Sequence, residues 1–320
     1  MKENIKIIDV TLRDGGFVCD FDWPVNFAKS CINTLSDTDV KYIELGYWKQ
    51  TSKSQNKFFN LNNKTVKDLT QALSPSRFAV MIDFHYCSQN LEDYPKVDDG
   101  IFGLIRMTAR KDMINDAINF ADKLKSYTGL NVAFNIFNTS NYSDKELNKT
   151  VSKVSKRNFD IVGFADTHGH IDLAKDISRY EGAFDIAKQE NKETCFHLHD
   201  HTGKAYSNYM ACLNSSYIDY CDSSIRGLGK GLGNLKTECV VNKSDRFKIC
   251  ELISQNKTIL SHNVNPAYYL ITGTYGITDN YATQAAKKNI PIQVFADFCY
   301  SLKGLQKDNF NKNLISQFLP

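Results

Sequence analysis

The chain alternates short, apolar, β-rich runs with longer segments of helical periodicity, and this alternation is the sequence signature of parallel strands joined by helices. Eight runs have the length and composition of strands: residues 5–10, 42–46, 78–84, 102–107, 132–137, 161–165, 194–198 and 217–223. Helices are predicted between them at residues 24–35, 113–127, 144–154, 173–189 and 205–214. Eight strands with eight crossovers predict an α/β fold, a (β/α)8 TIM barrel.

Polar side chains support a closed barrel over an open sheet, because they stand near the C-terminal ends of several different strands. A barrel gathers all of those ends at one mouth. The residues are Arg13 and Asp14 after the first strand, Glu44 in the second, Asp83 and His85 closing the third, Arg106 closing the fourth, Asp166 after the sixth, and His197 and His199 in the seventh.

The length of 320 residues accommodates a barrel of about 250 residues and an appendage. Beyond the eighth strand, helical patterns cover residues 249–260, 266–275 and 281–288. We therefore predict a barrel domain over residues 1–245 and a helical extension packed on it over residues 246–320.

Composition excludes several classes of function. The net charge of +3 comes from dispersed basic residues, which gives no support to nucleic-acid binding. No apolar run approaches the roughly 20 residues that span a membrane, and the N-terminus enters a strand without a signal-peptide hydrophobic region, so a cytoplasmic location is predicted. Nine cysteines without a Cys-x-x-Cys pair argue against a zinc ribbon or a secreted disulfide framework.

The segment His197-Leu198-His199-Asp200-His201 holds three of the seven histidines of the chain. Side chains two apart on a strand share one face, with their backbones roughly 7 Å apart. A histidine pair of this kind is often only packed or hydrogen-bonded. Together with Asp14 from the first strand, however, it forms the two-histidine, one-carboxylate set of a divalent metal site with open positions. His201 is a further candidate near this site.

Three other motifs add candidates at the mouth. The glycines of Asp14-Gly15-Gly16 allow close approach of the backbone, and Arg13 offers a planar fork for a carboxylate or an enolate. The loop at residues 227–234, Gly-Leu-Gly-Lys-Gly-Leu-Gly-Asn, is predicted to bring Asn234 toward the metal, and it lacks the Gly-Lys-Ser/Thr ending of a P-loop. Asp166 and Thr167 are expected at the mouth, while the roles of His168 and His170 stay open.

These motifs, in this order, resemble the DRE-TIM metallolyase superfamily, which includes 4-hydroxy-2-oxovalerate aldolases, HMG-CoA lyases, and the isopropylmalate and homocitrate synthases. The resemblance runs from Asp9 to about Glu238. Besides the two metal-site motifs and the glycine-rich loop, it rests on Ile43-Glu44-Leu45-Gly46 and Ala165-Asp166-Thr167-x-Gly169. Within the superfamily, the chain is most similar to the aldolase branch, with an Asp-Gly-Gly-Phe start.

The resemblance implies the chemistry and the roles of individual residues. Asp14, His197 and His199 would hold Mg²⁺ or Mn²⁺, with Asn234 as a fourth or neighbouring ligand, and Arg13 would stabilise an enolate oxygen. The implied reaction makes or breaks a carbon–carbon bond of a 4-hydroxy-2-oxo acid, giving pyruvate or a related 2-oxo acid and an aldehyde. Substrate-binding residues are expected among Glu44, Tyr47, Arg106, Asp166 and Thr167.

One departure from the aldolases concerns the general base. Those aldolases carry a histidine shortly after the Asp-Gly of the first motif, whereas this chain has Phe17. The acyl-CoA branches place Gln or Glu there, and these are missing too. Asp83 and His85 are therefore the candidate bases, ahead of His168 and Tyr47.

Two alternatives to the aldolase remain. One is an acyl-CoA-dependent Claisen-type synthase or lyase of the same superfamily. The other is a barrel that binds metal and ligand without turnover and serves as a subunit of a partner enzyme. The resemblance further implies self-association and, more weakly, an aldehyde dehydrogenase partner that could dock on the helices after Ile249.

Overall fold

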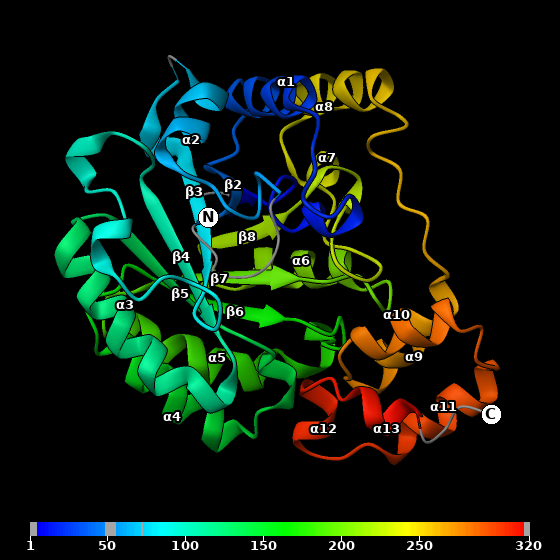
Figure 1. The fold of residues 1–320 in the computed structure, drawn as a ribbon. Coiled ribbons are helices and arrows are strands. Elements are labelled where there is room, and N and C mark those ends of the chain that lie inside the picture. The colour runs from blue at the N-terminus through cyan, green and yellow to red at the C-terminus, as the bar shows by residue number, and fades with distance from the viewer. Residues whose placement is uncertain (1–4, 49–55, 72, 317–320) are drawn as a thin grey trace.

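The computed structural model, which describes residues 5–48, 56–71 and 73–316, is built around a closed barrel of eight parallel strands (Figure 1). The strands pair in sequence order, and β8 pairs back to β1. They are β1 Lys6–Asp9, β2 Tyr42–Tyr47, β3 Phe78–Asp83, β4 Leu104–Ala109, β5 Asn131–Ile136, β6 Ile161–Asp166, β7 Glu193–Leu198 and β8 Tyr220–Ser223. The predicted (β/α)8 barrel with additional C-terminal helices is confirmed.

Two strands, β4 and β8, differ from their predicted bounds by more than one residue, and β4 begins at Leu104, not at residue 102. β4 continues to Ala109, because Thr108 and Ala109 keep pairing with β5, so Arg106 lies inside the strand and does not close it. β8 begins at Tyr220, not at residue 217. Just before it, the Asp219 carboxylate accepts a hydrogen bond from the Thr194 backbone N–H, while the Asp219 backbone N–H donates to the Thr194 carbonyl oxygen.

Helices cover the outside of the barrel, and five of the predicted ones are present within a residue of their expected ends. The barrel helices are α1 Val25–Ser36, α2 Asn63–Thr70, α3 Ile114–Thr128, α4 Asp144–Ser155, α5 Leu173–Gln189, α6 Ala205–Asn214 and α7 Thr237–Val240. The connection from β3 to β4, residues 84–103, is described throughout and contains two 3-10 turns, Leu91–Asp93 and Val97–Asp99, in place of an α-helix.

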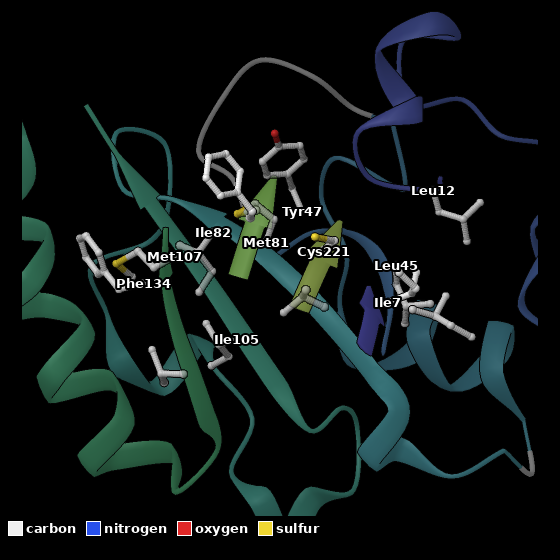
Figure 2. Close-up of a cluster of buried hydrophobic side chains, with 14 of the residues drawn as sticks. Ile7, Leu12, Leu45, Tyr47, Met81, Ile82, Ile105, Met107, Phe134 and Cys221 are labelled. Carbon is white, nitrogen blue, oxygen red and sulfur yellow. The ribbon is translucent and has the colours of Figure 1, made fainter. Parts of the chain in front are cut away.

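The barrel interior is filled in layers, because alternate side chains of each strand point inward. The lower layer is mainly apolar and includes Ile8, Tyr42, Leu104 and Cys195. The side chains that point outward pack against the helices, and Figure 2 shows part of this second cluster, including Ile105, Met107 and Phe134. Because mainly apolar side chains fill the lower part of the barrel, the polar residues that can line a site lie nearer the C-terminal ends of the strands.

The C-terminal helices divide between two places (Figure 1). α8 Lys243–Gln255 lies beside α1, whereas the last five helices lie beyond the C-terminal ends of β6 and β7, where all of them except α12 contribute to a separate apolar cluster. These five are α9 Pro266–Tyr275, α10 Asn280–Lys287, α11 Ile292–Ser301, α12 Leu305–Asp308 and α13 Lys312–Ser316. The domain division at residue 245 stays a prediction.

The predicted helix 249–260 was wrong in its bounds. α8 starts earlier, at Lys243, because the polar segment before Ile249 continues the same helix and Ile249 and Leu252 carry its buried face. It ends at Gln255, and the Asn256 side chain donates a hydrogen bond to the Leu252 carbonyl oxygen. The last three helices, α11 to α13, had no sequence prediction.

Two further sequence predictions concern membrane-spanning segments and the state of the cysteines. None of the helices in the described residues is long and apolar enough to span a membrane. All nine cysteines lie in the described residues and are free thiols, and six of them are buried.

Candidate metal centre and cavity

Asp14, His197 and His199 come together at the mouth of the barrel. Asp14 sits in the turn after β1, and its backbone N–H donates to the Val10 carbonyl oxygen at 2.8 Å. His197 lies on β7 and His199 directly follows that strand. One potential ligand atom from each residue lies within 4.8 Å of the others. The structure thus assembles the metal triad expected from the sequence.

The donor set fits a divalent cation. The His197 and His199 Nε2 atoms are 3.1 Å apart. Ligands at right angles on an octahedral ion with bonds of about 2.1 Å would lie about 3.0 Å apart, so the two lone pairs can converge on one ion. One carboxylate and two imidazoles leave further positions on such an ion for substrate and water.

Hydrogen bonds orient two of the groups at this site. His197 Nδ1 is 2.8 Å from the Asp222 carboxylate, to which it can donate its proton, and this leaves the lone pair of Nε2 to face the metal position. Asn234 Nδ2 donates to Asp14 Oδ2 at 2.8 Å and to the Leu228 carbonyl oxygen. Asn234 Oδ1 is buried and has no partner in the described part of the chain, which suits a fourth ligand.

Electrostatics keep Asp14 and His199 in the protonation states that metal binding requires. Burial alone would raise the pKa of Asp14, but the charge of Arg13 and the neighbouring histidines lower it far below its usual range. Burial, reinforced by His197, lowers the pKa of His199 well below its ordinary value. The carboxylate is therefore ionised and the His199 imidazole neutral at neutral pH, as metal ligands must be.

The glycine-rich loop packs directly against the metal ligands. A Cβ on Gly229 would lie 2.3 Å from Asn234 Nδ2 and 2.6 Å from Asp14 Oδ2. We expect Gly229→Ala to displace both side chains and to weaken Mn²⁺ binding at least tenfold with the fold retained, comparable to losses caused by disturbing groups that orient ligands. Isothermal titration with Mn²⁺ measures this.

Gly182→Ala is the matched control for that substitution. Gly182 lies in α5, and a Cβ there would meet nothing within 4 Å. Alanine should stabilise this helix by up to about 1 kcal/mol and leave Mn²⁺ binding unchanged. Normal Mn²⁺ affinity in Gly229→Ala would show that the loop does not set the ligand geometry.

Below the triad, a chain of buried ion pairs crosses the barrel. Arg13 Nε is 2.5 Å from Glu44 Oε2, and Arg13 Nη1 is 2.5 Å from Asp14 Oδ1. Arg106 lies 3.3 Å from the other oxygen of Glu44 and 2.6 Å from Asp222. Asp222 also contacts His197. The ion pairs therefore connect Asp14 on one side of the metal position with His197 on the other, by way of Arg13.

A cavity of about 320 Å³ opens above this network. Eight of the twelve predicted site residues line it: Arg13, Asp14, Tyr47, Asp83, Arg106, Thr167, His197 and His199. The exposed ring of Phe17 also lines it.

The other four predicted residues lie outside the cavity lining. Asn234 is behind the metal ligands, as described above. Glu44 is fully buried and held by Arg13 and Arg106. Asp166 is also fully buried, accepts hydrogen bonds from the His170 and Ile171 backbone N–H groups, and has its pKa raised to about 7 by burial.

His85 is exposed and its ring packs edge-on against Tyr86, whereas Asp83 and Tyr86 do line the cavity. β3 ends at Asp83, so the alternation of side chains along the strand no longer directs His85 into the barrel. The structure thus separates the two candidate bases that the sequence placed together.

The histidines whose roles were open also lie outside the metal group. Both ring nitrogens of His201 face main-chain carbonyl oxygens, those of His168 and Lys230. His168 is buried against Asp308 of α12, and His170 Nδ1 faces the Gly273 carbonyl oxygen of α9. These residues join the barrel to the C-terminal helices.

Sequence reasoning missed several polar residues of the site, among them Asp222, Asn135 and Lys230. Asp222 orients His197, Asn135 lines the cavity from β5, and Lys230 lines it while pairing with Asp279 at 2.5 Å. A polar side chain at an inward position of a predicted strand was the available signal for Asp222 and Asn135. The Lys230–Asp279 pair brings the C-terminal helices to the mouth, and Asn280 also lines the cavity.

Comparison with known proteins supports the family indicated by the motifs. The HMGL-like family model matches residues 104–260. This segment, just under half of the chain, is similar to the HMGL-like family. It carries both histidines of the metal triad and the glycine-rich loop, and the DRE-TIM resemblance is thereby confirmed.

Individual relatives agree with this assignment. The chain is 23% identical over 252 residues to a 4-hydroxy-2-oxovalerate aldolase of Geobacillus genomosp. 3, covering 78% of this chain and 72% of the relative. It is 21% identical over 241 residues to an oxaloacetate decarboxylase of Mycobacterium tuberculosis, covering 73% and 68%. Together, the match to the HMGL-like family and these relatives support a lyase of the DRE-TIM superfamily.

A solved structure agrees in fold. The N-terminal domain of an aldolase candidate from Bacteroides vulgatus superposes with a TM-score of 0.68 and 21% identity, covering 98% of this chain and all of that one. The C-terminal helices are therefore included in the shared fold.

Proposed function

We propose that this protein is a divalent-metal-dependent aldolase that cleaves or forms a carbon–carbon bond of a 4-hydroxy-2-oxo acid, with pyruvate or a related 2-oxo acid and an aldehyde as the other partners. The observation that carries the proposal is the convergence of Asp14, His197, His199 and Arg13 on one cavity. The relative named as a 4-hydroxy-2-oxovalerate aldolase supports it.

Asp14, His197 and His199, with Asn234 beside them, would hold Mg²⁺ or Mn²⁺. When bound, the cation supplies a Lewis acid that polarises the keto oxygen of the substrate. Arg13 stabilises the negative charge that develops on the same oxygen when the C3–C4 bond breaks. Its position is fixed by Glu44 and Asp14, so little reorganisation accompanies the reaction.

Asp83 is the base that removes the proton from the C4 hydroxyl in this proposal. Its carboxylate lines the cavity, and burial raises its pKa, which makes it a better proton acceptor than an ordinary aspartate. The exposed His85 loses its place as an alternative. Burial raises the pKa of Tyr47, so its phenol stays neutral and can donate a hydrogen bond at the cavity wall.

Pyruvate release from a panel of 4-hydroxy-2-oxo acids tests the proposal. The metal-stripped protein should release none, and addition of Mg²⁺ or Mn²⁺ should restore release. Metal binding without product from any member of the panel would favour the acyl-CoA-dependent reaction or the non-catalytic barrel. The cytoplasmic location, self-association and an aldehyde dehydrogenase partner stay predictions from the sequence.

Arg13→Ala separates charge stabilisation from metal binding. Because Arg13 is not a metal ligand, we expect Mn²⁺ affinity to stay within about tenfold, while kcat falls by about 10²–10³, the usual cost of removing one group that stabilises an oxyanion. Titration with Mn²⁺ and pyruvate-release kinetics measure the two effects. Near-normal kcat would contradict the role assigned to Arg13.

A further inference from the structure

The wall of the cavity opposite the metal triad is polar. β8 lies between β7 and β1 in the closed ring, so β4 is the strand across the barrel from the metal position. Asp83, Thr108 and Asn135 are paired in register across β3, β4 and β5, and all three line the cavity. A substrate held by the metal triad at one end would extend toward this row.

Asn135 is the best oriented member of the row. Its Oδ1 lies 3.5 Å from Arg106 Nη2. The opposite amide orientation would bring two N–H donors together, because a guanidinium only donates, so Arg106 fixes which way the amide points. The Asn135 side chain is buried, and its Nδ2 has no hydrogen-bond partner among the described residues.

The neighbouring strand leaves room for this side chain. Gly163 of β6 is paired with Asn135, and a Cβ at position 163 would lie 1.9 Å from Asn135 Oδ1. The absence of a side chain at Gly163 therefore leaves the space that the Asn135 amide occupies. The result is a buried N–H donor, held in place on a residue that lines the cavity and without a partner among the described residues.

We propose that Asn135 is a specificity-determining residue, which donates a hydrogen bond from Nδ2 to a hydroxyl oxygen of the substrate beyond C4. The substrate class is therefore a 4-hydroxy-2-oxo acid with at least one further hydroxyl group, and the aldehyde partner is a hydroxyaldehyde. This inference rests on the proposed aldolase function.

The chemistry of the neighbouring residues matches a hydroxyl group on the substrate. A hydroxyl accepts and donates at once. It can accept from Asn135 Nδ2 and donate to Thr108 Oγ1, whose own proton is directed to the Asn135 carbonyl oxygen at 3.3 Å. An apolar substrate tail would leave the buried amide unpaired, which disfavours its binding by about tenfold or more.

The test compares cleavage of 4,5-dihydroxy-2-oxopentanoate and 4-hydroxy-2-oxopentanoate by the full chain with Mn²⁺. We expect kcat/KM to favour the dihydroxy acid by about tenfold or more in the native protein. In Asn135→Leu, which keeps the approximate side-chain volume and removes the donor, the ratio should fall to near one, mainly through a higher KM for the dihydroxy acid. Asn135→Ala should behave in the same way.

Asn131→Leu is the matched control, since Asn131 is exposed at the other end of the same strand. It should keep the native ratio. Mn²⁺ affinity and thermal unfolding show whether each variant is folded and binds metal. Cleavage of both acids with equal kcat/KM by the native protein, or an unchanged preference in both Asn135 variants, overturns the role of Asn135 and leaves the aldolase proposal intact. Absence of metal-dependent cleavage in the native protein overturns both.

Discussion

His199→Ala is expected to abolish turnover and to weaken Mn²⁺ binding by more than about 100-fold, because disturbing groups behind a metal ligand already costs 10–100-fold. Its Nε2 is one of three ligand atoms that lie within 4.8 Å of one another, so the remaining two cannot hold the ion in the same geometry. Asp14→Asn should have the same effect, since it removes the only negative charge of the triad. Titration with Mn²⁺ and metal-dependent pyruvate release measure the two losses.

Two further variants calibrate this result. His262→Ala removes a histidine of the segment between α8 and α9, outside the metal group, and should leave both measurements unchanged. Asp222→Asn leaves the three ligands in place but disturbs the partner of His197 Nδ1, so an intermediate loss of about 10–100-fold is expected. Turnover by His199→Ala at more than a few per cent of the native rate would rule out the metal-dependent mechanism.

Glu44→Ala is expected to cause the largest loss of stability, about 3–5 kcal/mol in the free energy of unfolding. Glu44 is fully buried and pairs with both Arg13 and Arg106. Its removal leaves two guanidinium groups in the barrel interior with one carboxylate partner each, and an uncompensated buried charge is costly. Urea unfolding measured by circular dichroism gives the change.

An exposed ion pair provides the control. Arg110 and Asp112 are 3.3 Å apart with side chains 44% and 48% exposed, so Arg110→Ala should change the free energy of unfolding by less than about 1 kcal/mol. Glu44→Gln, which keeps an oxygen acceptor for one arginine, should fall between the two. Equal stability of Glu44→Ala and the native protein would mean that water or a shift of Arg13 and Arg106 replaces the lost carboxylate.

The barrel and the metal ligands were predictable from local sequence patterns. Strand and helix periodicity depend on neighbouring residues, and eight alternating units allow few other folds. The triad was predictable because His197 and His199 share one strand face, and because the barrel places the turn after β1 close to the end of β7. The same reasoning located Arg13 beside the candidate metal site.

Only the tertiary structure decided how deeply each polar side chain is buried and which group it contacts. The sequence places Glu44, Asp166 and His85 near strand ends, but it does not tell whether an arginine, a backbone N–H or solvent will meet each one. Glu44 is buried beneath Arg13, Asp166 turns to the backbone of residues 170 and 171, and His85 lies beyond the end of β3.

Contacts between distant segments were also decided only by the fold. Asp222 meets His197, Asn135 meets Arg106, and Asp279 of the C-terminal helices meets Lys230 of the glycine-rich loop. Each pair joins residues from separate strands, loops or helices, so no local periodicity encodes it. The residue types at the metal site follow from the sequence, whereas the shape and polarity of the substrate cavity follow from packing among strands, loops and helices that are remote in the chain.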